Sequence, residues 1–282
     1  MFPNFFNIKY SINELARNKS SLFFDIAKSQ FHYQMTGVTD EADFQLKIKS
    51  ELLFSSIFWL NTDSAEVARM NQRFTVAILS DKKQDIKLIP IKYLALIYQR
   101  GMSSTNSTKL NEYAFRLDAV LDKVQLTAMQ KFEVKCYEAV FRDDSNQNIE
   151  HQFERSNLVL HLTDPSQTIA NIYEATHMVL YLSLLGKAKI KTRLRIVFSK
   201  YLRIVLFYAL QESMLDILAE ILLCCAILEE YPPLFAKGLT KVTEFFEQVL
   251  AENQDLHNCV HYYHTILVLR MLVKKLNESE GS

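Results

Sequence analysis

The stretch that decides the fold is Leu215-Asp-Ile-Leu-Ala-Glu-Ile-Leu-Leu-Cys-Cys-Ala-Ile-Leu228. Aliphatic residues occupy almost its whole circumference when it is drawn as a helix, which indicates a helix buried in a protein core. Two acids, Asp216 and Glu220, interrupt it at positions i and i+4 and therefore share one face. Ionised carboxylates are seldom buried without partners, so this face either meets solvent or lines a polar cavity. Both interpretations stay open at this point.

The rest of the chain also has the composition of a helical protein. Only 5 Gly and 5 Pro occur in 282 residues, whereas strand proteins need frequent turns that use these residues. Capping signals such as Thr127-Ala-Met-Gln130 divide the sequence into helices joined by short polar loops. We therefore predict an all-α fold of about eleven or twelve helices, arranged as an α/α toroid or as an irregular helical bundle.

The length of 282 residues fits one large domain or two ordinary ones. We expect a single all-helical domain over residues 1–282, with a subdivision near residues 143–148 as the alternative, because Asp143–Gln147 is the most linker-like stretch. Beyond Gly186, apolar periodicity predicts helices near 190–210, 213–230, 234–252 and 256–277.

The charge of the chain is balanced, because Lys plus Arg and Asp plus Glu both total 32. A net charge of zero gives no general field for steering toward nucleic acids or anionic membranes, although it does not exclude a local basic patch. No run of uncharged apolar residues is long enough to span a bilayer. We therefore expect neither a nucleic-acid partner nor a membrane partner.

Four cysteines are present: Cys136, Cys224, Cys225 and Cys259. They form no Cys-x-x-Cys spacing and no disulfide framework typical of secreted proteins. The first residues also lack the basic start and long apolar region of a signal peptide. These features predict reduced thiols and a cytoplasmic location.

A second apolar stretch, Ile172 to Gly186, contains Glu174 and His177. On a helix these two residues are neighbours, and a carboxylate beside an imidazole can orient it as a general base or acid. Tyr173, His177 and Tyr181 form one polar-tipped stripe of the same helix. We predict that His177 lies on an inward-facing side, within reach of Asp216 or Glu220. The alternative is that helix neighbours satisfy both Glu174 and His177.

The last predicted helix carries His257, His261 and His264 at positions i, i+4 and i+7. Two histidines one turn apart can share a divalent metal, although a structural zinc site needs further ligands. The alternative is that these histidines pack between helices or face solvent. None of the common nucleotide-binding, hydrolase or zinc-protease motifs is present, and no cofactor is predicted.

Two motifs together resemble a known family. The segment Thr176-His-Met-Val-Leu-Tyr181, with Gly186 beyond it, precedes Asp216-Ile-Leu-Ala-Glu220. This order is similar to that in a family of uncharacterised bacterial all-helical proteins, which share a Thr-His-x-x-x-Tyr helix followed by an Asp-x-x-x-Glu helix. The resemblance covers about residues 170–230, and this chain lacks the acidic residue expected before the glycine. It implies that His177 and the two acids act together.

Three functions follow from these patterns. We expect a helical accessory or recognition protein that binds a peptide or protein partner in an inner groove, because aromatic residues are abundant at 12%. The first alternative is an α/α-barrel enzyme that uses His177 as acid or base with Glu174, Asp216 and Glu220. The second is a metal-binding helical protein that uses His257, His261 and His264. The sequence gives no indication of the oligomeric state.

Overall fold

The computed structural model describes residues 42–58, 65–82, 88–102, 107–144, 147–155, 162, 168–252 and 263–278. Every regular element in these residues is a helix, so the prediction of an all-α fold is confirmed. Eleven helices are described: α2 (Ala42–Phe58), α3 (Ala65–Ser80), α4 (Leu88–Met102), α5 (Ser107–Leu121), α6 (Ala128–Arg142), α7 (Gln147–Glu154), α9 (Ile169–Leu182), α10 (Thr192–Gln211), α11 (Leu215–Ile227), α12 (Phe235–Glu252) and α13 (Tyr263–Glu278).

The described residues group into two compact units, which we name after their central helices. The α4 unit contains α2 to α7 together with residues 181–188. The α11 unit contains residues 168–180, most of α9, and the helices α10 to α13. The single domain expected over residues 1–282, like the alternative subdivision near 143–148, stays a prediction.

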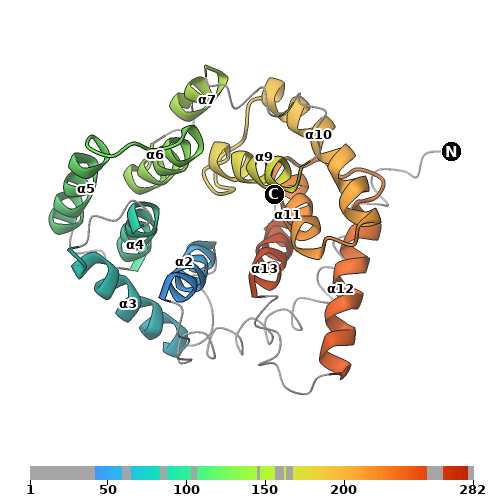
Figure 1. Cartoon of the computed structure of the whole chain (residues 1–282), viewed down its shortest axis with the longest axis horizontal. Coiled ribbons are helices and arrows are strands. Elements are labelled where there is room, and N and C mark those ends of the chain that lie inside the picture. Colours follow the sequence, from blue (N-terminus) through green and yellow to red (C-terminus); the bar gives the residue numbers. More distant parts are fainter. Residues whose placement is uncertain are drawn as a thin grey trace. The chain divides into compact units, whose positions relative to one another are not determined.

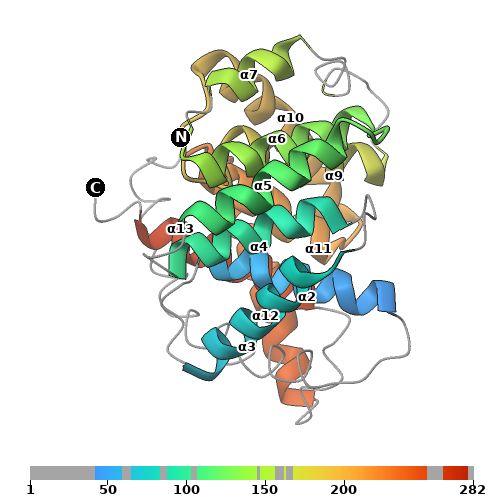
Figure 2. The same cartoon turned by 90° about the vertical axis from the view of Figure 1, so that its left-hand side faces the viewer.

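In the α4 unit, α4 packs against α2, α3, α5 and α6 (Figures 1 and 2). Its side chains are buried on nearly every side, and Tyr93 and Leu96 are both 0% exposed. Pro90 lies in the first turn, where a backbone N–H has no partner inside the helix and its loss is tolerated. The hydroxyl of Tyr93 donates a hydrogen bond to Asp118 of α5, which satisfies the polar end of this buried side chain.

The start of α6 was predicted from the sequence, whereas the helix that follows its end was not. Thr127 and Gln130 form the expected capping box at the start of α6. At its end, Asp143 takes a left-handed conformation with φ of 60°. The helix that follows, α7, was not predicted. Its eight residues bury only two apolar side chains, Ile149 and Phe153, which is too short a periodic signal to separate from a loop.

In the α11 unit, α10, α12 and α13 pack around α11 (Figure 1). Every residue of α11 from Ile217 to Ala226 is buried, as the aliphatic circumference of this stretch predicts. Gly238 of α12 lets the two helices approach closely: an added Cβ would lie 3.2 Å from Leu222 and 3.3 Å from Leu218. The last helix was predicted to begin near residue 256, which lies outside the described residues. Within the described residues, α13 begins at Tyr263.

The described cysteines Cys136, Cys224 and Cys225 are free thiols and are buried. Burial raises the pKa of all three thiols, so they behave as small apolar core residues rather than as thiolates. Among the described helices, none combines the length and the apolar content needed to cross a bilayer.

Candidate metal centre

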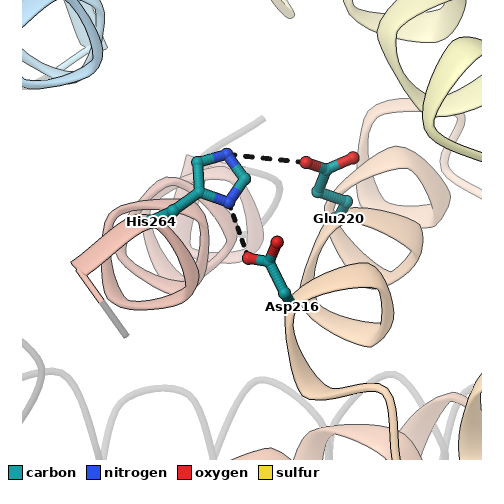
Figure 3. Close-up of side chains that lie close together, drawn as sticks. All are labelled: Asp216, Glu220 and His264. Carbon is teal, nitrogen blue, oxygen red and sulfur yellow. Dashed lines mark hydrogen bonds and ion pairs between the residues drawn. The ribbon is translucent and has the colours of Figure 1, made fainter. Parts of the chain in front are cut away.

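Two helices of the α11 unit bring three ionisable side chains together (Figure 3). Asp216 and Glu220 lie one turn apart on α11, and His264 comes from α13. The imidazole lies between the two carboxylates, with Nδ1 at 2.6 Å from Oδ1 of Asp216 and Nε2 at 3.5 Å from Oε1 of Glu220. One ligand atom from each residue lies within 4.8 Å of the other two. We call this set the Asp216–Glu220–His264 cluster.

Asp216 accepts hydrogen bonds on both carboxylate oxygens. The hydroxyl of Tyr173 on α9 donates to Oδ2 at 2.5 Å, and the hydroxyl of Thr265 donates to Oδ1 at 3.1 Å. Burial by itself would raise the pKa of Asp216, but the hydrogen bond and charge of His264, with these two hydroxyls, lower it to about 2. Asp216 is therefore an ionised carboxylate that holds the imidazole through Nδ1.

Glu220 lies in a different environment, because its side chain is only 3% exposed. Burial raises the pKa of Glu220, and the negative charge of Asp216 adds to that effect. The charges of His177 and His264 and a hydrogen bond from Thr176 act in the opposite direction without reversing the shift. Two carboxylates one helical turn apart thus have pKa values displaced in opposite directions.

The hydroxyl of Thr176 has two acceptor oxygens within hydrogen-bond distance. Its Oγ1 lies 2.5 Å from Oε2 of Glu220 and 2.9 Å from the carbonyl oxygen of Tyr173. A hydroxyl carries one hydrogen and can donate only one such bond. Thr176 therefore donates to one of these two oxygens at a time, Oε2 of Glu220 or the carbonyl oxygen of Tyr173.

The residues predicted from sequence are distributed unevenly around the cluster. His177 on α9 is half-buried, stacks on the ring of Tyr173 with centroids 6.3 Å apart, and acts on Glu220 through its charge. Glu174 is half-buried on the same helix and does not belong to the cluster. His264 does belong to it, together with two acids of α11. His257 and His261 lie outside the described residues.

No role was predicted from the sequence for the threonine hydroxyls that bond to the carboxylates. Thr176 and Thr265 are 0% and 2% exposed, and each directs its hydroxyl to one acid of α11. Tyr173 was part of the predicted polar stripe, and its hydroxyl reaches Asp216. Tyr181, at the other end of that stripe, instead packs edge to face on Phe132 and Tyr137 in the α4 unit. The sequence feature that could have identified these hydroxyls is a threonine at a buried position of an apolar helix.

Comparison with protein families gives one match. Residues 64–272 match the model of a domain of unknown function, DUF6895. The matched region contains every residue of the cluster and the α9 residues around it. Searches of the curated proteins and of the solved structures both found no significant match to the chain.

Proposed function

The chain belongs to the DUF6895 family of domains of unknown function, and we propose that it acts through a divalent metal ion bound at the Asp216–Glu220–His264 cluster. The observation that carries this proposal is the placement of the His264 ring between two carboxylates from one face of α11 (Figure 3). Imidazole and carboxylate donors are the usual protein ligands of zinc and of related first-row metals.

The separation between His264 and Glu220 suits a shared ion. Nε2 and Oε1 are 3.5 Å apart, which is long for a hydrogen bond. Two donors bound tetrahedrally to one zinc ion at their usual bond lengths lie about 3.3 Å apart. We therefore assign Nε2 of His264 and the carboxylate of Glu220 as direct ligands. A cation there would also give the buried carboxylate of Glu220 a compensating charge.

Asp216 would then orient the imidazole rather than hold the metal. Histidines that bind a metal through one ring nitrogen commonly donate the other N–H to a carboxylate, which fixes the tautomer and the ring. The 2.6 Å contact between Nδ1 of His264 and Asp216 has this form. Tyr173 and Thr265 in turn hold the carboxylate of Asp216.

A site with so few protein ligands would leave coordination positions open for water or for a substrate. Catalytic zinc sites differ from structural ones in this respect, and the bound metal can activate water or polarise an oxygen of the substrate. His177, whose charge acts on Glu220, would lie beside such a site as a further polar group. We accordingly favour metal-assisted chemistry on a small ligand.

A metal-free acid–base pair is the second candidate, and one specific observation supports it. The pKa of Asp216 is lowered and that of Glu220 is raised. Carboxyl groups with pKa values displaced in opposite directions often divide the roles of base and acid between them. Here Glu220 would be the acid, and His264, oriented by Asp216, would be the base. Binding of a peptide or protein partner in a groove stays a prediction from sequence.

Metal binding distinguishes these possibilities. Purified protein is stripped with a chelator and titrated with Zn²⁺, Co²⁺, Mn²⁺ and Fe²⁺ by calorimetry, with metal content measured by mass spectrometry. We expect one ion per chain, and at least a 100-fold loss of affinity in Glu220→Gln and in His264→Ala. Asp216→Asn is expected to weaken binding by about 10–100-fold, as an outer carboxylate does.

Matched controls use the same residue types at exposed positions. Glu212→Gln, at the end of α10, and His151→Ala, on α7, should leave affinity unchanged. Circular dichroism verifies that each variant is folded. If no ion binds, or if Glu220→Gln and His264→Ala bind it as the parent protein does, the metal assignment is wrong. A metal-free catalytic pair would then be the remaining candidate at this site.

A further inference from the structure

The charge balance of the whole chain conceals a strongly basic segment. Between Lys189 and Gln211 there are six Lys and Arg residues and no Asp or Glu. Most of this segment is α10, a helix of 20 residues. Four of these cations lie on α10 itself, and Lys189 and Lys191 come directly before it.

One side of α10 faces the core of the α11 unit, where α10 packs on α11 and α12. The buried residues on that side are Leu194, Phe198, Tyr201, Leu202, Val205, Leu206, Ala209 and Leu210. The opposite side exposes Ile196, Ile204 and Phe207, at 48%, 59% and 55% respectively. These are three of the seven large apolar side chains that are strongly exposed among the described residues, so bulky apolar groups concentrate on this helix.

Cations lie among these apolar groups on the same side of the helix. At about 100° of rotation per residue, Arg193, Lys200 and Arg203 fall within the arc that contains Ile196, Ile204 and Phe207, and all three cations are exposed. We call these six residues the outer face of α10. Two neighbouring cations are paired, Lys189 with Glu229 and Arg195 with Glu230, each at 3.6 Å.

The cations of the outer face differ from those two in their pairing. Arg193, Lys200 and Arg203 form no ion pair with any residue in the described part of the chain. The outer face thus combines uncompensated positive charge with exposed aliphatic and aromatic groups. Larger exposed apolar patches commonly mark interaction sites, and an uncompensated basic patch favours an anionic partner.

We infer that the outer face of α10 binds the surface of an anionic lipid bilayer. Helices at membrane surfaces place Phe and aliphatic side chains at the boundary between headgroups and acyl chains, and place Lys and Arg near lipid phosphates. Ile196, Ile204 and Phe207 would enter that boundary, and Arg193, Lys200 and Arg203 would contact the headgroups. From Ile196 to Phe207 the helix advances about 16 Å, which is enough to lie along the surface.

A lipid surface fits this face better than other anionic partners do. Peptide recognition generally uses a groove that encloses the anchor residues, whereas the outer face is the convex side of a single helix. A nucleic acid would pair with the cations but would leave Ile196 and Ile204 without an apolar partner. This inference is independent of the proposed metal centre. It also departs from the expectation, based on net charge, that no membrane is involved.

Vesicle co-sedimentation of the full chain tests the inference. The probes are vesicles of phosphatidylcholine alone and vesicles containing 30% phosphatidylglycerol. We expect binding only to the anionic vesicles, weakened by high salt. Replacing Arg193, Lys200 and Arg203 together with Gln should lower the partition coefficient by roughly 100-fold, about a factor of five for each charge. The double variant Ile204→Ser with Phe207→Ser should also reduce binding severalfold.

Controls of equal chemistry lie in the α4 unit. Arg73, Lys109 and Lys131 are exposed cations, and Val76 and Phe115 are exposed apolar side chains. Changing those cations to Gln, or those apolar residues to Ser, should leave vesicle binding unchanged. Absence of vesicle binding overturns the inference, as does binding that the α10 variants do not alter. Binding to poly-glutamate or to an oligonucleotide in place of vesicles, or self-association that depends on Ile204 and Phe207, would also overturn the lipid assignment.

Discussion

The central helices of the two units, α4 and α11, are buried to a similar extent, but their polar groups differ in charge and in partners. The hydroxyls of Tyr93 and Tyr98 on α4 bond to Asp118 of α5 and to the carbonyl oxygen of Ala68 in α3. The side chain of Asp118, which accepts from Tyr93, is 33% exposed. On α11, by contrast, the carboxylate of Glu220 is itself inside the core at 3% exposure.

The difference holds for the two central helices only, because the α4 unit also buries a carboxyl group, that of Glu150 on α7, at 1% exposure. Neutral hydroxyls at the ends of buried side chains need one partner each and are compatible with an ordinary core. A buried carboxyl group needs partners for both oxygens or must remain protonated, and burying an uncompensated charge costs several kcal/mol. Packing alone gives no reason for an acid in α11, the most apolar of the described helices. Of the two central helices, α11 is therefore the one whose buried acid needs an explanation beyond packing.

The first prediction is that α4 and α11 contribute equally to the stability of the protein. Leu96 of α4 and Leu222 of α11 are each 0% exposed. Replacing either with Ala removes buried methyl groups and leaves a cavity, so each should lower the free energy of unfolding by about 2–5 kcal/mol. Urea unfolding followed by circular dichroism measures this. Val76→Ala, at a position 54% exposed, is the control and should change stability by less than about 0.5 kcal/mol.

The same experiment addresses the prediction of a single domain. If residues 1–282 unfold as one domain, both variants shift one common transition. Two separate transitions, with Leu96→Ala shifting one and Leu222→Ala shifting the other, would contradict that prediction. A loss below 1 kcal/mol in only one variant would mean that the two central helices are not equivalent cores.

The second expected effect concerns the hydroxyl that supports Glu220. Thr176→Val removes a hydroxyl that lies 2.5 Å from the buried carboxyl group and replaces it with a methyl group. Leaving that group without its partner should lower the free energy of unfolding by about 1–3 kcal/mol. Thr243→Val is the matched control, because Thr243 is equally buried but bonds only to the carbonyl oxygen of Leu239 on its own helix. Equal losses in the two variants would show that Glu220 has no special need of Thr176.

The helices were largely predictable, and α7 shows where prediction failed. Caps and 3.6-residue periodicity depend on neighbours in the sequence. The cap at Thr127 and the buried helix α11 could therefore be predicted from the sequence alone. The eight residues of α7 bury too few apolar groups to give such a signal. Its position depends on contacts with α6, which are made only in the folded chain.

The sequence identified the two acids of the site but did not connect them with His264. The i, i+4 spacing placed Asp216 and Glu220 on one face, and both of them meet His264. The sequence grouped His264 with His257 and His261, which lie outside the described residues, and local spacing did not reveal that His264 also meets acids of another helix. Its partners are 48 and 44 positions away in the chain. Pairing across that distance is decided by how α11 and α13 pack.

The third expected effect is a dependence of stability on pH with opposite signs at the two acids. The pKa of Asp216 lies at about 2, below its ordinary value of 3.8. A lowered folded-state pKa stabilises the protein above pH 3.8, and this contribution is lost as the pH falls toward 2. The side chain of Asp216 is 39% exposed, so solvent screening reduces the contribution to about 1 kcal/mol.

Glu220 acts in the reverse direction. Its pKa is raised, so the folded state retains a proton that the unfolded chain releases near pH 4.5. Stability therefore falls as the pH rises above 4.5 until the folded-state pKa is passed. Unfolding measured from about pH 2 to pH 8 should show that Asp216→Asn approaches the stability of the parent protein as the pH falls from 3.8 toward 2. Glu220→Gln should remove the decline above pH 4.5, and a decline that persists in this variant would assign it to another group.

The smallest expected effect is at the periphery of the α4 unit, where charges stay near solvent. Arg142 lies 2.8 Å from Asp118 and 3.0 Å from Glu138, and its side chain is 45% exposed. Exposed ion pairs contribute little because water screens them and because ordering long side chains loses entropy. Arg142→Met should lower the free energy of unfolding by less than about 1 kcal/mol, and 1 M salt should reduce the difference further. Asp118 would still accept the hydrogen bond from the hydroxyl of Tyr93 in this variant.

The measurement is urea unfolding of Arg142→Met at low and high salt, compared with that of Thr176→Val. If Arg142→Met were as destabilising as Thr176→Val and independent of salt, polar groups at the edge of α4 would contribute as much to stability as those inside α11. The contrast between the two central helices, and the functional meaning given to Glu220, would then have no energetic basis.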